Sequence, residues 1–194
     1  MVRILGQNIA LRDKQLEDAS NDYSWRTDEE LSSLDAATPI TMTYPQFLRY
    51  YQDELRYPGI GSRRFAIETI HGQHIGNCMY YDIDNFRGQA ELGIMIGDRN
   101  YWNKGYGADV VKTLVNHIFT DTTLNRIYLH TLEWNTRARR SFKKVGFNEV
   151  KKVNRDRKQF ILMEIRRHEW LNGNQNPNAS QDSPSLLDPG PTGL

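Results

Sequence analysis

The stretch "YWNKGYGADVVKTLVNHIF", residues 101–119, decides the fold of this chain. It begins with a lysine and two closely spaced glycines, Lys104, Gly105 and Gly107. Behind them, apolar side chains recur at the spacing of one helix face: Val110, Val111, Leu114, Val115, Ile118 and Phe119. A glycine loop that opens a helix leaves free N–H groups where a phosphate or pyrophosphate can bind. A tight turn that needs positive φ would use the same glycines, so this alternative stands beside the anion site.

Two common nucleotide-binding motifs fail to fit this loop. The Walker motif places its lysine after the last glycine and before a serine or threonine, whereas Lys104 precedes both glycines. The dinucleotide motif G-x-G-x-x-G needs a third glycine where this chain has Val110. The loop therefore predicts an anion site of another kind.

Strands and helices alternate on both sides of the loop. Segments 89–98 and 125–134 read as strands that enclose the helix, which predicts a β-α-β crossover and a parallel strand pair. His71-Gly72-Gln73 is a hairpin signal between two further strands, which predicts an antiparallel pair. The two strands of that hairpin are residues 63–70 and 74–84. The other predicted elements are strands at 3–11, 147–153 and 158–165 and helices at 13–25, 43–56 and 136–145.

Capping residues mark the ends of these helices. Asp13 lies near the start of the first helix. Thr43 is the expected N-cap of the second, ahead of Pro45 in its first turn, where the missing N–H does no harm. Gly146 is expected to end the short basic helix in the left-handed conformation.

The composition predicts one soluble cytoplasmic domain without a metal site. The chain has 194 residues, 38% of them apolar, and no apolar run long enough to span a bilayer. The single cysteine, Cys78, excludes an intramolecular disulfide and a cysteine-cage zinc site. We expect a domain of residues 1–168 and a disordered tail of residues 169–194, because the tail has too little apolar surface to offset its ordering entropy.

Charge is distributed unevenly along a chain whose net charge is only +1. Residues 1–98 carry 9 basic against 15 acidic side chains, a net charge of −6. Residues 99–168 carry 16 against 6, a net charge of +10. The first half is thus suited to a cationic ligand and the second to an anionic one, although ordinary solvated surface explains each half equally well.

Two segments resemble the signature motifs of the GNAT superfamily of N-acetyltransferases. The first motif, Q/R-x-x-G-x-G/A, is matched by residues 102–107, with Trp102 in place of Gln or Arg. The second motif is matched in "NTRARRSFKKVGF" at Asn135, Ala138, Phe142, Gly146 and Phe147. Upstream, residues 74–102 resemble the branch that includes ribosomal-protein N-terminal acetyltransferases and spermidine acetyltransferase.

The resemblance implies an α/β (α+β) fold. Its sheet is mixed and mostly antiparallel, with seven strands and helices on both faces, and the fourth and fifth strands form a splayed parallel pair. It also implies acetyl-CoA as cosubstrate. The pantetheine arm would lie between the splayed strands beside Met95 and Ile96. The remaining implied contacts to CoA come from Trp102, Asn103, Lys104, Gly105, Tyr106, Gly107 and Ala108 in the loop, and from Asn135 and Arg140. Asparagine at position 135 also suits a helix N-cap, and any single base on the helix 136–145 also suits a solvated face.

The expected reaction is attack by a neutral amine on a thioester. Glu91 on the fourth strand is the first candidate for the general base, and Glu133 is the second because it shares a strand face with Asn135. An ion-paired surface carboxylate is an equal alternative for each. Phe142 replaces the tyrosine that often protonates the departing thiolate in this family, so water is left to supply that proton.

We therefore expect an acetyl-CoA-dependent N-acetyltransferase. Its acceptor is either a small cationic amine or a protein N-terminus, and a non-catalytic acyl-CoA-binding module is the alternative. Neither nucleic acid nor a membrane is expected as a partner, since the bases cluster where CoA phosphates would lie and no aromatic stacking pattern accompanies them. A homodimer remains an open option.

Overall fold

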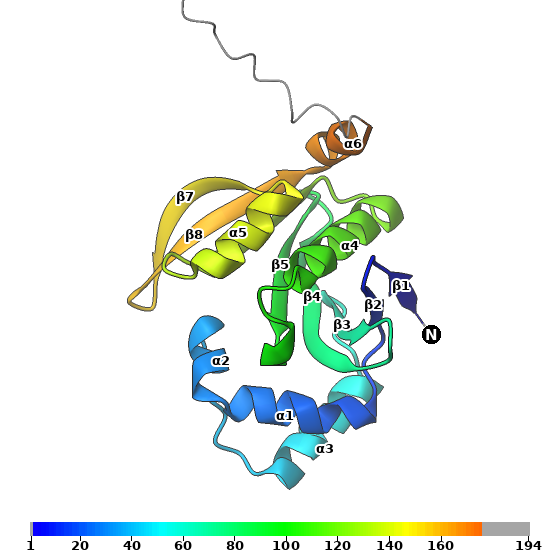
Figure 1. The fold of residues 1–194 in the computed structure, drawn as a ribbon, viewed down its shortest axis with the longest axis vertical. Coiled ribbons are helices and arrows are strands. Elements are labelled where there is room, and N and C mark those ends of the chain that lie inside the picture. The colour runs from blue at the N-terminus through cyan, green and yellow to red at the C-terminus, as the bar shows by residue number, and fades with distance from the viewer. Residues whose placement is uncertain (1, 176–194) are drawn as a thin grey trace, which may run out of the picture.

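The computed structural model describes residues 2–175, which form one mixed sheet with helices on both faces (Figure 1). Eight strands are ordered β1-β2-β3-β4-β5-β6-β8-β7, and every neighbouring pair is antiparallel except β5–β6. The predicted fold class is confirmed, with eight strands in place of seven. The strands are β1 (Arg3–Leu5), β2 (Ile9–Arg12), β3 (Ser62–Thr69), β4 (His74–Asp84), β5 (Gln89–Ile96), β6 (Arg126–Leu132), β7 (Asn148–Arg155) and β8 (Lys158–Arg166).

Within residues 2–175, six α-helices and two short 3-10 helices surround the sheet. They are η1 (Leu16–Asp18), α1 (Ala19–Thr27), α2 (Glu29–Leu34), α3 (Tyr44–Arg56), η2 (Arg99–Tyr101), α4 (Tyr106–Asp121), α5 (Thr136–Val145) and α6 (Arg167–Gln175). In Figure 1, α4 and α5 lie together over one part of the sheet, while α1, α2 and α3 gather at its other end. Among the described residues, no helix has the length and apolar content needed to cross a membrane.

The extra strand arises because the predicted strand 3–11 breaks at Gly6. The N–H groups of Gln7 and Asn8 donate to the two carboxylate oxygens of Asp109 at 3.0 and 2.7 Å. A Cβ on Gly6 would lie 2.5 Å from Thr113 Oγ1, so only glycine fits this turn against α4. A tertiary contact, not the local strand pattern, sets the break.

The predicted amphipathic helix is confirmed as α4. All six of its predicted core residues are buried. They pack against apolar side chains of β2, β5 and β6 that include Ile9, Leu92 and Ile127. On the other face of the sheet, Asn77 of β4 donates to Asp22 of α1 at 2.6 Å. Cys78, the next residue of β4, belongs to the core cluster that contains the apolar face of α4. Because adjacent residues of a strand point to opposite faces, α1 and α4 cover opposite sides of the sheet.

The first predicted helix starts later than expected. Asp13 precedes it by several residues, and α1 begins at Ala19 after η1. Arg12 and Asp18 form a buried bidentate ion pair at 2.7 and 2.8 Å in this entry segment, which holds the backbone in place before the helix begins. The second predicted helix is confirmed, because Thr43 and Gln46 form a capping box at the start of α3.

The described part of the chain ends in a helix that the sequence did not predict. Trp170 of α6 is 7% exposed and packs into the core. Arg167 donates to the carbonyls of Thr122 and Leu124 at 2.6 and 2.9 Å, which caps the end of α4. The predicted boundary at residue 168 therefore falls inside α6, and residues 169–175 are helical. The rest of the predicted tail, residues 176–194, lies outside the described residues.

The parallel pair β5–β6 is short and then opens. Its partners are Gln89 with Arg126, Ala90 with Ile127, and Glu91 with Tyr128. Beyond Glu91, β5 continues to Ile96 and β6 continues to Leu132 without further pairing between them. The predicted splay between these strands is thus present, and the glycine loop follows the open end of β5.

Candidate active site

The glycine loop has the backbone conformation of an anion-binding turn. Asn103 and Gly105 take positive φ values of 58° and 87°, and α4 begins at Tyr106. Because the first N–H groups of a helix have no carbonyl four residues earlier, those of Tyr106, Gly107 and Ala108 are free for a ligand. The loop therefore contains both features weighed from the sequence, a left-handed turn at Gly105 and an open helix start.

Trp102 connects this loop to the splayed strand. Its indole Nε1 donates to the carbonyl of Ile96 at 2.7 Å. The guanidinium carbon of Arg137, from the first turn of α5, lies 3.6 Å from the ring centre, and that of Arg99 lies 5.4 Å away. The stacking of these arginines on Trp102 was not predicted, because it joins three segments that are separate in the sequence.

The backbone of β5 presents alternate residues to the open gap. Gly97 N–H donates to Ile75 on β4 at 2.9 Å. Antiparallel partners exchange hydrogen bonds at every second residue, so Met95 also faces β4. The N–H and C=O groups of Ile94 and Ile96 then face the gap. Of the two strand residues expected beside a pantetheine arm, Ile96 has its backbone groups on that side.

Asn135 caps α5, as the alternative interpretation expected. Its Oδ1 accepts a hydrogen bond from the N–H of Ala138 at 3.1 Å. The cap occupies only the side-chain oxygen. The side-chain NH₂ group therefore remains available for a ligand carbonyl, and the two roles proposed for Asn135 are compatible.

Four of the five basic residues of α5 fall into two groups. Arg139 and Lys143 both pair with Glu149 of β7, at 2.7 and 3.0 Å. Among the described residues, neither Arg140 nor Arg137 has a carboxylate within ion-pair distance. Arg140 is exposed on α5, and Lys104 is exposed in the loop. Arg137 and Arg140 are thus better placed to meet phosphates than Arg139 and Lys143, which Glu149 holds.

Glu91 forms a buried pair with a histidine that the sequence analysis did not select. Its Oε1 lies 2.8 Å from His130 Nδ1, and the two side chains are 9% and 8% exposed. An ionised carboxylate only accepts hydrogen bonds, so Nδ1 carries the proton in this pair. The pair sits where the parallel ladder ends, because Glu91 is the last residue of β5 with a partner on β6.

Acidic side chains gather around this pair. Burial first, and then the charges of Glu91, Asp82 and Asp35, raise the pKa of Tyr81 on the neighbouring strand β4. Tyr81 is therefore a neutral phenol at physiological pH. Three carboxylates thus act on Tyr81, an arrangement that favours a cationic ligand near it.

Glu133 was selected as a candidate base because it was expected to lie on the same strand face as Asn135, but it lies outside β6. β6 ends at Leu132, and Glu133 occupies the turn before α5. Its carboxylate pairs with Lys152 of β7 at 2.5 Å. The expected shared strand face with Asn135 is therefore absent. Phe142 is buried, with its ring centre 5.9 Å from that of Phe147, so it belongs to the core.

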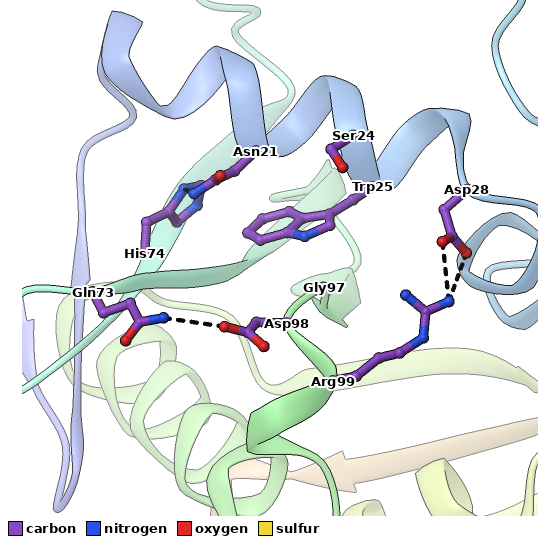
Figure 2. A pocket seen from close by; sticks show the side chains of 9 residues that line it. All are labelled: Asn21, Ser24, Trp25, Asp28, Gln73, His74, Gly97, Asp98 and Arg99. Carbon is purple, nitrogen blue, oxygen red and sulfur yellow. Dashed lines mark hydrogen bonds and ion pairs between the residues drawn. The ribbon is translucent and has the colours of Figure 1, made fainter.

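Two cavities flank the open end of the sheet. One, of about 400 Å³, lies between α1 and the end of β5 (Figure 2). There the ring of Trp25 lies over Gly97, where a Cβ would come within 2.1 Å of it. The other, of about 490 Å³, is lined by Ser33, Leu132, Glu133, Trp134, Arg157, Lys158 and Gln159. In the described part of the chain, no three His, Cys, Asp or Glu side chains are placed to hold a metal ion.

Comparison with known proteins agrees with this geometry. Residues 8–148 match the family model of the acetyltransferase (GNAT) domain. The N-acetyltransferase p20 of Bacillus licheniformis is 30% identical over 128 residues, which cover 66% of this chain and 71% of that protein. The spermine/spermidine N(1)-acetyltransferase of Bacillus subtilis is 35% identical over 81 residues. That match covers 39% of this chain and only 53% of that protein.

Solved structures share the fold at low sequence identity. Spermidine N-acetyltransferase from Vibrio cholerae, crystallised with CoA and spermine, superimposes with a TM-score of 0.75 at 21% identity. It covers 85% of this chain and 99% of its own. The aminoglycoside acetyltransferase AAC(6')-Ib with coenzyme A has a TM-score of 0.72 at 19% identity, over 86% of this chain and 99% of its own. The chain therefore belongs to the GNAT family of acetyltransferases and is an N-acetyltransferase.

Proposed function

We propose that this N-acetyltransferase transfers the acetyl group of acetyl-CoA to a primary amine of a polyamine or a related small cationic amine. The observation that carries the proposal is the buried pair of Glu91 and His130 at the last paired position of the splayed strands. The acidic surroundings of Tyr81 add to it, since they favour a cation over a neutral acceptor. Relatives named as spermine and spermidine acetyltransferases match about half of their own length.

The described residues fit the donor. The open N–H groups from Lys104 to Ala108 suit a pyrophosphate at the start of α4. Arg140 and Arg137 suit the outer phosphates, because neither is held by a carboxylate on α5 or β7. In the gap beyond Glu91, the backbone groups of Ile94 and the N–H of Ile96 suit the amide groups of an extended arm, while the Ile96 carbonyl accepts from Trp102. Acetyl-CoA supplies the thioester that the amine attacks.

The acceptor must lose a proton before it can attack. An amine with a pKa near 10.4 is neutral in about one molecule in 2,500 at pH 7, which costs roughly 4.6 kcal/mol. An α-amine with a pKa near 8 costs only about 1.4 kcal/mol. A general base is therefore worth more to an enzyme that acts on polyamines than to one that acts on protein N-termini.

We assign that role to Glu91. Its carboxylate is buried beside the gap, where the Nδ1–H of His130 donates to Oε1 and orients the group. The neutral phenol of Tyr81, whose pKa is raised by burial and by Glu91, lies opposite Glu91 on the adjacent strand. Since Phe142 has no acidic proton to donate, water protonates the thiolate of CoA. The thiol has a pKa of about 8.5, which makes the thiolate a fair leaving group.

Free-thiol release across a panel of acceptors tests the proposal. The panel holds spermidine, spermine, an aminoglycoside, free amino acids and short peptides, each with acetyl-CoA. We expect turnover with the polyamines. Turnover with peptides alone would contradict the polyamine proposal and would indicate a protein N-terminus as the acceptor. A thermal melt with excess acetyl-CoA checks the donor separately, and the absence of any shift in the melting temperature would refute the donor site.

A further inference from the structure

Arg99 binds two carboxylates of the α2 segment at once. Its Nη2 lies 2.8 and 3.0 Å from the two oxygens of Asp28, and 2.7 Å from Glu30 Oε2. Its Nε also donates to Glu30, at 3.0 Å. Figure 2 shows the guanidinium at the edge of the cavity under α1, directed at Asp28. A bidentate network of this kind holds its partners more firmly than an isolated surface ion pair.

These contacts fix the start of α2. Asp28 is the N-cap of this helix and accepts the N–H of Leu31 at 2.9 Å. At the other end, the carbonyl of Ala36 accepts a hydrogen bond from Lys158 Nζ at 2.6 Å. Arg99 follows β5, and Lys158 begins β8 beside β6. The short helix is therefore attached on both sides of the gap between β5 and β6.

The α2 segment also forms part of the cavity at the end of β6. Ser33 lines it together with Leu132 and Trp134. Helix propensity alone does not explain why α2 forms, since the helix has only six residues and two of them are serines. The contacts of this segment with Arg99 and Lys158 supply the stabilisation that so short a helix lacks by itself.

We infer that Arg99 is a positioning residue for the acceptor: it holds α2 across the gap between β5 and β6, so that the wall of the acceptor cavity stays in place. The inference rests on the proposed function and takes as the acceptor site the cavity beside Ser33 and Trp134. Leu132 of this cavity lies two residues along β6 from His130, on the same face of the strand, which places the cavity next to Glu91 and His130. Arg99 lies beside Trp102 as well, but the closer stack on that ring is made by Arg137. Loss of Arg99 should therefore affect the acceptor more than the donor.

The test compares Arg99→Gln with Arg137→Gln in steady-state kinetics and in calorimetric titration with CoA. For Arg99→Gln we expect KM for the amine to rise about five- to tenfold, since its ion pairs are partly exposed. We expect Kd for CoA to stay within about twofold, because Arg137 still stacks on Trp102. Arg137→Gln should give the opposite split, with weaker CoA binding and a nearly unchanged KM for the amine. Arg99→Lys should restore part of the loss, since lysine can still pair with one carboxylate.

Arg87→Gln is the matched control. Arg87 is an exposed arginine in the β4–β5 turn, paired with Asp84 at 3.7 Å, and its loss should change neither constant. A lower melting temperature for Arg99→Gln with unchanged KM would assign it a purely structural role and overturn the inference. Equal losses of amine and CoA binding would overturn it too. Failure of the wild-type enzyme to acetylate any amine would instead refute the proposed function.

Discussion

The indole N–H of Trp102 donates to the carbonyl of Ile96 at 2.7 Å, across the bend that separates β5 from the glycine loop. The Ile96 carbonyl faces the open gap, where no strand of the sheet can pair with it. Trp102 thus satisfies a strand carbonyl and, in the same contact, fixes the distance between the loop and the splayed strand. Two parts of the expected donor site are held in register by one side chain.

Replacing Trp102 by phenylalanine should weaken donor binding. The ring that stacks on Arg137 is kept, but the hydrogen bond to Ile96 is lost. One such bond is worth about 0.5–1.5 kcal/mol, so we expect Kd for CoA to rise about twofold to twelvefold in calorimetric titration. Trp134→Phe is the control, because Trp134 lines the other cavity and is 58% exposed. An equal loss of CoA affinity in both variants would contradict this account.

Much of the fold is written in local sequence patterns. The apolar face of α4 follows from its helical spacing, and the hairpin at Gly72 follows from a turn residue whose φ is 86°. The elements that escaped prediction are held by tertiary contacts. The break at Gly6 depends on Asp109, about a hundred residues away, and the short polar helix α2 depends on Arg99. Neither contact leaves a signal in the segment that it shapes.

The candidate site divides in the same way. The glycine loop is recognisable from sequence because its conformation needs particular residues at fixed spacing. The partner of Glu91 is not, since His130 meets it only through the parallel register of β5 and β6. The strand face that Glu133 was expected to share with Asn135 is absent for a related reason. That expectation required β6 to extend past Leu132, and the chain turns toward α5 at that point.

The Glu91→Gln substitution should lower kcat with a polyamine by about a hundredfold at pH 7, which is the low end for a general base. The loss should shrink toward pH 10, because more of the amine is then neutral without help. Thiol release over this pH range measures both effects. Glu54→Gln provides the control, since Glu54 is an exposed carboxylate on α3, paired with Arg64. A loss that is the same at every pH would remove Glu91 from the role of base.

The two loop glycines should respond differently to alanine. Gly105 has a φ of 87° with nothing within 4 Å of an added Cβ, so the cost of Gly105→Ala is backbone strain of about 1–2 kcal/mol. That should lower the melting temperature by about 2–8 °C for a domain of this size. At Gly107 the added Cβ would lie 3.7 Å from Ser141 Oγ, an ordinary contact within a helix. Gly107→Ala should therefore leave the melting temperature unchanged or raise it slightly. Equal destabilisation would mean that the turn at Gly105 is not the reason for its glycine.

Stability should fall as the pH drops below neutrality, because His74 is buried in its neutral form. Its Nε2 lies 2.9 Å from the carbonyl of Gly76 and donates to it. Burial first, and then the charge of Lys14, lower the pKa of His74 below its ordinary 6.5. The neighbouring Asp18 titrates below this range. Burial opposes its ionisation, but hydrogen bonds from Arg12 and the backbone of Gln15 prevail and lower its pKa below 3.8.

The sign of the effect follows from linkage. With a lowered pKa in the folded state, the unfolded chain binds a proton that the folded chain does not, so stability is full above pH 6.5 and is lost as the pH falls from there. The loss approaches about 1.4 kcal/mol per pH unit at most. Urea unfolding at pH 7.5 and 5.5 measures it, and His74→Gln should reduce the difference between the two midpoints because glutamine does not titrate. His168→Gln, at an exposed position on α6, should leave that difference as in the wild type. An unchanged pH dependence in His74→Gln would show that another group is responsible.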